Sequence, residues 1–200
     1  TLIKVLTGVY EKDEGQIFIK GVEGAVAIRS PQDAQKHGIS TVCQEITLCP
    51  NLTVAENMFI GRTNGATQNW KKMNADTEEI LKSLDIPAKA TQQLSSCSIA
   101  VQQMVAIARA VDMECKVLIL DEPTSSLDEQ EVAKLFKVMR DLKARGVGII
   151  FVTHFLDQVY EVCDKITVLR DGQLVGEYEI ENLPIVQLVS KMLGKELDDM

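Results

Sequence analysis

Two adjacent carboxylates follow a short apolar run in the middle of the chain. Residues 117–120 are apolar, two of them are β-branched, and Asp121 and Glu122 come directly after them. Such a run is typical of a strand buried on both faces of a parallel sheet, and ligands bind at the carboxyl ends of such strands. Carboxylates there are costly unless they hold a cation or do chemistry. We therefore predict Asp121 as a Mg²⁺ ligand and Glu122 as the group that polarises an attacking water; the alternative is a solvated acidic turn.

Two further polar side chains follow apolar runs of the same kind. Gln44 follows residues 39–43 and His154 follows residues 147–152, so each is expected near the carboxyl end of a strand. The Gln44 amide can accept a hydrogen bond from a water and can coordinate Mg²⁺, and the His154 imidazole can bind and sense an anion. Taken alone, Gln44 is better explained as part of a polar surface turn and His154 as a structural residue, so the functional interpretation depends on their order with the other candidates.

Two helix starts add candidate sites. Ser98 precedes a predicted helix over 98–111, where amide donors and the positive dipole end can face a phosphate; the alternative is a helix that is merely capped. Asp128 ends the turn Ser125-Ser126-Leu127-Asp128 and can cap the helix that follows it. His37 and Lys4 lack such support and are predicted to be surface helix residues.

Composition bounds the classes of function. The 200 residues suit one domain, or one with a small subdomain, and 46% hydrophobic with 25% charged residues is ordinary for a globular chain. A net charge of −8 does not favour general nucleic-acid binding. No apolar run approaches the roughly 18 residues of a spanning helix, so a membrane role is expected through a partner. Five scattered cysteines predict reduced thiols and no zinc site.

The hydrophobic pattern predicts an α/β chain. Helices are expected over residues 1–7, 30–36, 54–60, 74–84, 98–111, around 132–142 and 183–193. Strands are expected over residues 16–20, 39–43, 117–120, 147–152, 166–169 and 174–178, the last two joined by an Asp171-Gly172 hairpin turn. The chain begins with Thr1 inside a helical pattern, which we interpret as the cut edge of a fragment.

The order of these features resembles the nucleotide-binding subunit of ATP-binding-cassette (ABC) transporters. A glutamine after one strand, a Ser-led helix, an Asp-Glu strand end, a Ser-Leu-Asp turn and a histidine after the next strand occur in sequence over nearly the whole chain. The resemblance implies a P-loop NTPase cassette with a mainly parallel sheet, a helical subdomain over about 52–112 and a small antiparallel element. ATP and Mg²⁺ are the implied cofactors.

The resemblance also implies roles for the candidate residues. Gln44 matches the Q-loop and His154 the switch histidine, both at the γ-phosphate, with Asp121 on Mg²⁺ and Glu122 as general base. Thr1 matches the last residue of the P-loop motif, near the α-phosphate. The rest of that phosphate cradle lies outside the 200 residues, so we expect no useful ATPase activity from them alone.

The stretch from Cys97 matches the family signature with substitutions. Ser98, Ala100 and Gln102 are the implied contacts with ATP on a second cassette, and Asp128 matches the D-loop that touches that cassette. Cys97, Ala100 and Val101 stand where the family usually has Leu, Gly and Gln. Ala100 adds a methyl group where a close approach is expected, which puts its contact in doubt.

Four other segments resemble sugar-import cassettes: Gly8-Val9-Tyr10, residues 51–57, residues 153–157 and residues 192–197. The substituted signature over residues 98–110 most resembles that of the galactofuranose-type branch. The implied partners are transmembrane permease subunits, a second cassette and, indirectly, a sugar-binding protein, and the implied place is the cytoplasmic face of the cell membrane. The alternatives are a soluble ABC ATPase that acts on ribosomes or DNA, and a catalytically degenerate regulatory cassette.

Overall fold

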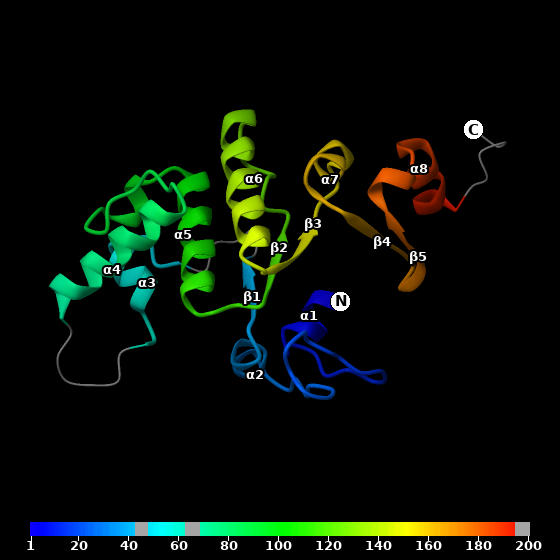
Figure 1. Ribbon diagram of the computed structural model, residues 1–200, viewed down its shortest axis with the longest axis horizontal. Coiled ribbons are helices and arrows are strands. Elements are labelled where there is room, and N and C mark those ends of the chain that lie inside the picture. The colour runs from blue at the N-terminus through cyan, green and yellow to red at the C-terminus, as the bar shows by residue number, and fades with distance from the viewer. Residues whose placement is uncertain (43–47, 63–68, 195–200) are drawn as a thin grey trace. The chain divides into compact units, whose positions relative to one another are not determined.

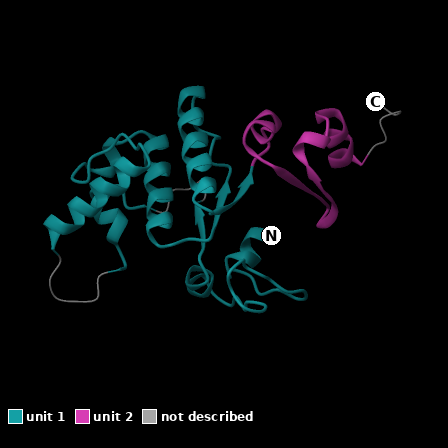
Figure 2. Cartoon of the chain, in the orientation of Figure 1, with its two compact units in different colours: residues 1–152 teal, residues 153–200 magenta. Residues whose placement is uncertain are grey.

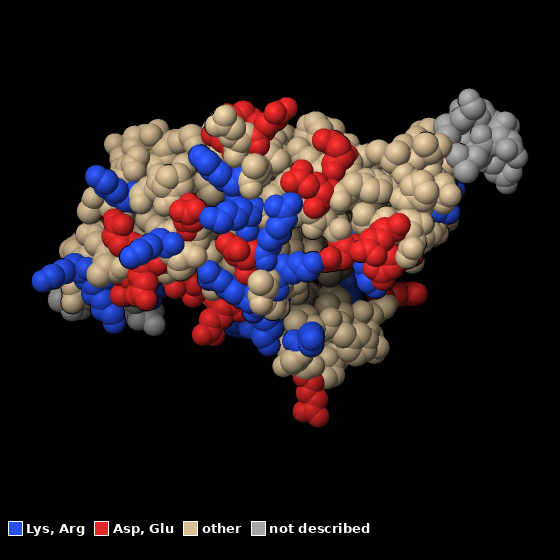
Figure 3. All heavy atoms as spheres, turned by 45° about the horizontal axis from the view of Figure 1, so that its top comes forward, with Lys and Arg blue, Asp and Glu red and all other residues tan. Residues whose placement is uncertain are grey.

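The computed structural model describes residues 1–42, 48–62 and 69–194. The chain divides into two compact units, residues 1–152 and 153–200 (Figure 2). Acidic and basic side chains are interspersed over the face of the molecule shown in Figure 3.

A parallel sheet forms the centre of the first unit. Its strands are β1 (Ile39–Val42), β2 (Val117–Asp121) and β3 (Gly148–Val152), in the order β1-β2-β3. Val42 pairs with Leu120, and Asp121 with Val152, so the three strands end together. Three residues of β2 are fully buried, as a parallel strand requires: Leu118, Ile119 and Leu120. The predicted parallel sheet is confirmed, and so is the burial of β2. The prediction that residues 147–152 form a buried strand was wrong in part, because β3 lies at the edge of this sheet, where Gly148 and Ile150 are exposed.

Helices α5 (Ile99–Asp112) and α6 (Glu129–Ala144) flank the central strand in sequence and contact each other (Figure 1). Only residues 113–116 join α5 to β2, so the helix and the strand run in opposite directions. The start of α5 and the end of β2 therefore lie at the same end of the unit. The turn after β2 is also short, which brings the start of α6 to that end as well.

Two shorter helices pack near the other strands. The first, α1 (Leu2–Leu6), contributes Ile3 and Leu6 to a hydrophobic cluster that includes Ile119 of β2. The second, α2 (Pro31–Lys36), begins where predicted, because the Ser30 hydroxyl accepts from the Asp33 amide at 3.1 Å and Pro31 suits the first helical position.

The expected helical insert consists of α3 (Val54–Phe59), α4 (Trp70–Ser83), a 3-10 turn (Leu94–Ser96) and α5. Helix α3 contacts both α4 and α5. Buried apolar side chains fill the space between the helices: Met58, Met73, Leu81, Leu84, Leu94 and Met104. The insert belongs to the same compact unit as the sheet, and its boundary at about 52–112 stays a prediction.

The second unit contains α7 (Leu156–Val162), β4 (Lys165–Arg170), β5 (Gln173–Glu179), a 3-10 turn (Ile180–Asn182) and α8 (Ile185–Leu193). Strands β4 and β5 are antiparallel, as predicted. Asp171 and Gly172 have φ angles of 51° and 78°, which a two-residue type I′ hairpin turn needs at both positions. Val168, Leu183 and Leu188 form the core of this unit.

Three predictions of secondary structure were wrong in part. The strand expected over 16–20 is an isolated bridge between Ile17 and Val26, because Gly15, Gly21 and Gly24 turn the chain on either side with positive φ angles. Helix α4 begins at Trp70 rather than residue 74, since the Asn69 side chain caps it. Helix α7 was not predicted, because its seven residues, about two turns, are too few for a clear 3.6-residue pattern.

Candidate nucleotide site

The end of β2 places Asp121 and Glu122 on different backbone conformations. Asp121 is the last residue of the strand and is half-buried. Glu122 has a φ angle of 50°, in the left-handed region that non-glycine residues rarely adopt, while its amide still donates to the Val152 carbonyl at 2.9 Å. Its Oε2 atom is shielded from solvent. Strained residues of this kind cluster at functional sites, so the geometry supports a chemical role for Glu122.

The turn after Glu122 is tied back to it. Both the amide and the hydroxyl of Ser125 donate to the Glu122 carbonyl, at 3.4 and 3.2 Å. The turn then ends at Asp128, whose carboxylate accepts from the Glu131 amide at 2.8 Å, while Glu131 Oε2 accepts from the Asp128 amide at 3.3 Å. This capping box confirms the predicted cap. A contact of Asp128 with a second cassette stays a prediction.

The start of α5 shows how the substituted signature is arranged. Ser98 caps the helix, and its hydroxyl accepts from the Val101 amide at 3.3 Å. Gln102 turns back and donates to the Cys97 carbonyl at 3.0 Å. Ser98 and Ile99 are exposed, whereas Ala100 is only 2% exposed. The methyl group of Ala100 therefore packs inside the protein, and Ser98 and Ile99 form the outer surface of this helix start.

Three of the predicted residues, Ser98, Asp121 and Asp128, lie at the same end of the first unit, because α5 and α6 both run opposite to β2. Gln44 lies outside the described residues. His154 belongs to the second unit, where its ring lies against that of Phe155 with centroids 4.1 Å apart.

The remaining candidates lie at helix ends. Thr1 is exposed at the N-cap of α1 and its side chain makes no capping bond. Lys4 is an exposed helix residue, as predicted, with its Nζ 5.0 Å from the centre of the Tyr10 ring. His37 is the half-buried C-cap of α2.

The Asp121–Glu122 pair fits a magnesium ion better than a metal held by protein alone. Within residues 1–42, 48–62 and 69–194, no three His, Cys, Asp or Glu side chains are grouped as metal ligands. Magnesium commonly uses one or two carboxylates, with waters and substrate phosphates as its other ligands. Asp121, a half-buried carboxylate at the carboxyl end of β2, matches the protein part of that donor set, and Glu122 beside it can hold a water.

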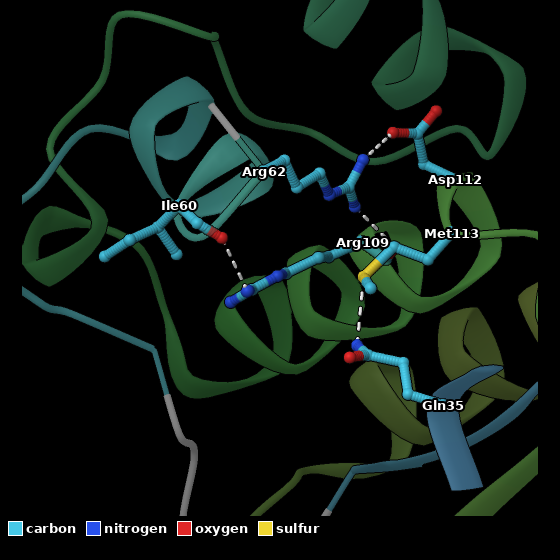
Figure 4. Close-up of polar contacts among 6 residues, drawn as sticks. All are labelled: Gln35, Ile60, Arg62, Arg109, Asp112 and Met113. Carbon is cyan, nitrogen blue, oxygen red and sulfur yellow. Dashed lines mark hydrogen bonds and ion pairs between the residues drawn. The ribbon is translucent and has the colours of Figure 1, made fainter. Parts of the chain in front are cut away.

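An arginine cluster in the helical insert was missed by sequence reasoning. Arg62 forms an ion pair with Asp112 and donates to the Arg109 carbonyl at 3.0 Å, while Arg109 donates to the Ile60 carbonyl at 2.9 Å (Figure 4). Burial lowers the pKa of Arg109, and the charge of Arg62 lowers it further. These partners are about 50 residues apart in sequence, so no local pattern could have indicated them.

Asn57 was also missed as an individual residue. It is a fully buried polar residue on a helix whose other buried residues are Val54, Ala55 and Met58. The signal available in the sequence was this polar residue on an otherwise apolar helix face.

Comparison with known families settles the kind of protein. The model of the ABC transporter family matches residues 1–125. The chain belongs to the ABC transporter family. The chain is 51% identical over 200 residues to the galactofuranose transporter ATP-binding protein YtfR of Escherichia coli, and 42% identical over 202 residues to the ribose import ATP-binding protein RbsA of Caldanaerobacter subterraneus. It spans 40% of the length of each of these relatives, and they cover 99% and 100% of it.

Solved ABC structures share the fold. The ADP conformation of MJ1267, an ATP-binding cassette of an ABC transporter, has a TM-score of 0.80 at 23% identity and covers 96% of this chain, which covers 80% of it. The cbiO1 protein of Clostridium perfringens, part of an ABC transporter complex, has a TM-score of 0.76 at 24% identity, with coverages of 96% and 75%. Among the described residues of this ABC chain, none of the helices has the length and apolar character needed to cross a bilayer.

Proposed function

We propose that this chain is the ATP-binding and hydrolysing part of an ABC importer that takes up a sugar. The observation that carries the proposal is the carboxyl end of the central strand β2, where Asp121 is followed by Glu122 in a left-handed conformation. Relatives named for galactofuranose transport and ribose import support a monosaccharide as the cargo. A protein that acts on ribosomes or DNA is not favoured, because the relatives at 42–51% identity are sugar importers.

Asp121 and Glu122 would have different roles at the carboxyl end of β2. Asp121 would hold Mg²⁺, which when bound supplies positive charge to the phosphates of ATP. Glu122 would orient the attacking water by accepting its hydrogen bond. The left-handed backbone, held by the bond from the Glu122 amide to Val152, would fix the direction in which the carboxylate points. As the family resemblance implies, the γ-phosphate would be contacted by Gln44 and His154. The α-phosphate would be contacted by Thr1.

The start of α5 would serve the ATP of a second cassette. Ser98 is exposed at the N-terminus of a 14-residue helix, where amide donors and the helix dipole favour an anion. Gln102 would act by holding the Cys97 carbonyl, and Ala100 by packing beneath the helix start. The added methyl of Ala100 therefore does not stand between this surface and a phosphate.

The importer would also need partners. Permease subunits in the membrane would carry the sugar, a second cassette would complete the nucleotide sandwich, and a sugar-binding protein would deliver the cargo. The chain would then lie at the cytoplasmic face of the membrane.

Cross-linking and uptake together test this proposal. In the full-length protein in membranes, Asn51→Cys, an exposed position beside the helical insert, should cross-link to a permease subunit. Vesicles that hold the complex should accumulate a pentose or hexose only with ATP on the cassette side. Failure to cross-link to any membrane subunit while ATP is still hydrolysed would contradict the transport role. Unchanged uptake when Asp121→Asn is introduced would point instead to a regulatory cassette.

A further inference from the structure

Asn57 is a fully buried polar residue of the helical insert, and its side chain is hydrogen-bonded at both the oxygen and the nitrogen. It lies on α3 and is 0% exposed, among Val54, Ala55 and Met58, which are also 0% exposed. A buried amide is costly unless its donors and acceptor are bonded. All hydrogen bonds of the Asn57 side chain are to main-chain atoms: Oδ1 accepts one bond, and the two N–H groups of Nδ2 donate to two carbonyls, with the Leu52 carbonyl at 3.5 Å as a weaker, shared acceptor.

Two of these bonds hold the main-chain amide and the main-chain carbonyl of the same residue, Cys49. Asn57 Oδ1 accepts from the Cys49 amide at 2.7 Å, and Asn57 Nδ2 donates to the Cys49 carbonyl at 2.9 Å. The same Nδ2 donates to the Thr53 carbonyl at 3.0 Å. The side chain of Asn57 thus pairs with the amide and the carbonyl of Cys49, as the main chain of a neighbouring β-strand would. Its bond to Thr53 means that both ends of the stretch 49–53 are held.

The stretch held by Asn57 is bonded in turn to the segment that leads into α5. The Ser95 amide donates to the Pro50 carbonyl at 2.9 Å and the Leu94 amide to the Leu52 carbonyl at 3.0 Å. Thr53 forms an isolated bridge with Gln93, and the Val54 amide donates to the Gln92 carbonyl at 2.9 Å. We call these contacts between residues 50–54 and 92–95 the insert ladder.

The insert ladder ends three residues before Ser98. Ser95 is bonded to Pro50, Ser96 and Cys97 close the 3-10 turn, and Ser98 then caps α5. The carbonyls of Pro50 and Leu52 lie between the two residues that Asn57 anchors. Loss of the Asn57 amide would therefore release the acceptors of the ladder and, with them, the approach to the start of α5.

We propose that Asn57 is a positioning residue that acts through the insert ladder to hold Ser98 at the nucleotide-facing end of the unit. Its effect on catalysis rests on the proposed function, whereas its effect on the ladder does not. A residue that only fills the core would loosen the whole unit when removed. A positioning residue loosens the ladder and the helix start first.

Hydrogen exchange and steady-state kinetics on the full-length protein test this inference. In Asn57→Ala, the amides of Leu94 and Ser95 should exchange at least about tenfold faster, while those of β2 and α6 keep their rates. The kcat for ATP should fall roughly tenfold with KM nearly unchanged, because misplacement of a helix start affects the reacting geometry more than ground-state binding. The milder Asn57→Ser carries both measurements if Asn57→Ala does not fold.

The matched control is Asn69→Ala, which removes another asparagine whose side chain accepts from a main-chain amide, that of Lys72 at 3.1 Å, outside the ladder. It should leave exchange at Leu94 and Ser95 and the kcat unchanged. Unchanged exchange at these two amides in Asn57→Ala, equal acceleration in α6, or an equal loss of kcat in the control would overturn the inference. If no form of the protein hydrolyses ATP, the proposed function fails, and the exchange pattern alone decides the role of Asn57.

Discussion

Arg62 donates a hydrogen bond to the main-chain carbonyl of Arg109, and Arg109 donates one to the main-chain carbonyl of Ile60, two residues before Arg62. Arg62 Nη2 binds the carbonyl of Arg109 in the last turn of α5, and Arg109 Nη2 binds the carbonyl of Ile60 at the end of α3. The two arginines thus close the end of the helical insert opposite to Ser98. Since α5 is one continuous helix, this closure helps to fix the direction in which its N-terminus points.

Replacement of Arg109 by methionine is expected to destabilise the insert. Arg109→Met keeps most of the aliphatic stem but removes an exposed hydrogen bond to the Ile60 carbonyl, and the loss of such a bond typically costs about 0.5–1.5 kcal/mol. Urea unfolding followed by circular dichroism measures the change. Lys71→Met, an exposed substitution on α4, is the control and should change the free energy of unfolding by less than about 0.5 kcal/mol. Equal effects of the two substitutions would show that the exchange of carbonyl bonds contributes nothing.

The cap of α6 depends on the Asp128 carboxylate. Asp128→Ala removes the acceptor of the Glu131 amide and is expected to cost about 1 kcal/mol of stability, whereas Asp128→Asn keeps an acceptor oxygen and should cost much less. Thermal unfolding of the two variants side by side tests this. A smaller loss for alanine than for asparagine would contradict the capping role.

Thr77 offers a substitution that should stabilise the protein. Its residue is 0% exposed, and its hydroxyl has no hydrogen-bond partner among the residues that the structure describes. Thr77→Val replaces the buried hydroxyl by a methyl group of similar size, so stability should rise by about 1 kcal/mol.

Thr53→Val is the matched comparison, because the Thr53 hydroxyl accepts from the Glu56 amide at 3.2 Å. That change should lower the melting temperature while Thr77→Val raises it. A fall in both would show that the Thr77 hydroxyl is satisfied in solution.

The thiols should differ in reactivity. Burial raises the pKa of the Cys115 thiol, while Cys49 is exposed. Because the thiolate is the nucleophile, a raised pKa leaves less of it at a given pH, and reaction at Cys115 should require higher pH or unfolding. Mass spectrometry of iodoacetamide-treated protein at pH 8 should show Cys49 modified well before Cys115. If Cys115 reacted with iodoacetamide as fast in the native protein as in urea, the burial of its thiol would be contradicted.

The parallel sheet and the helix caps could be predicted because their signals are local. Residues 117–120 and 147–152 are short apolar runs, and Ser30, Ser98 and Asp128 each stand directly before a helical pattern. A strand or cap of this kind is determined mainly by its own residues and by whether both faces are covered. The structure confirms these elements to within one or two residues.

The features that were not predicted depend on contacts distant in sequence or on backbone strain. Glu122 adopts a left-handed conformation while its amide bonds to Val152, thirty residues later, and no residue-type preference of glutamate indicates that conformation. The insert ladder joins residues 50–54 to residues 92–95, and although Asn57 stands out as a polar residue on an apolar helix face, its main-chain partners could not be predicted before those two segments were placed. The strand predicted over 16–20 is reduced to one bridge with Val26, because the glycine turns at Gly15, Gly21 and Gly24 limit the length over which the two segments can pair.

Hydrolysis of ATP by Glu122→Gln in the full-length protein tests the central claim most directly. Glutamine keeps the size and backbone preference of glutamate but is a far weaker base, so the variant should bind Mg²⁺-ATP and hydrolyse it at least about a hundredfold more slowly. Glu129→Gln, an exposed change on the neighbouring helix, should hydrolyse ATP at the unaltered rate. ATP recovered intact from the Glu122→Gln protein after many wild-type turnovers is the predicted result. Hydrolysis by that variant within a few-fold of the unaltered protein would contradict the assignment of the β2 end as the hydrolytic centre.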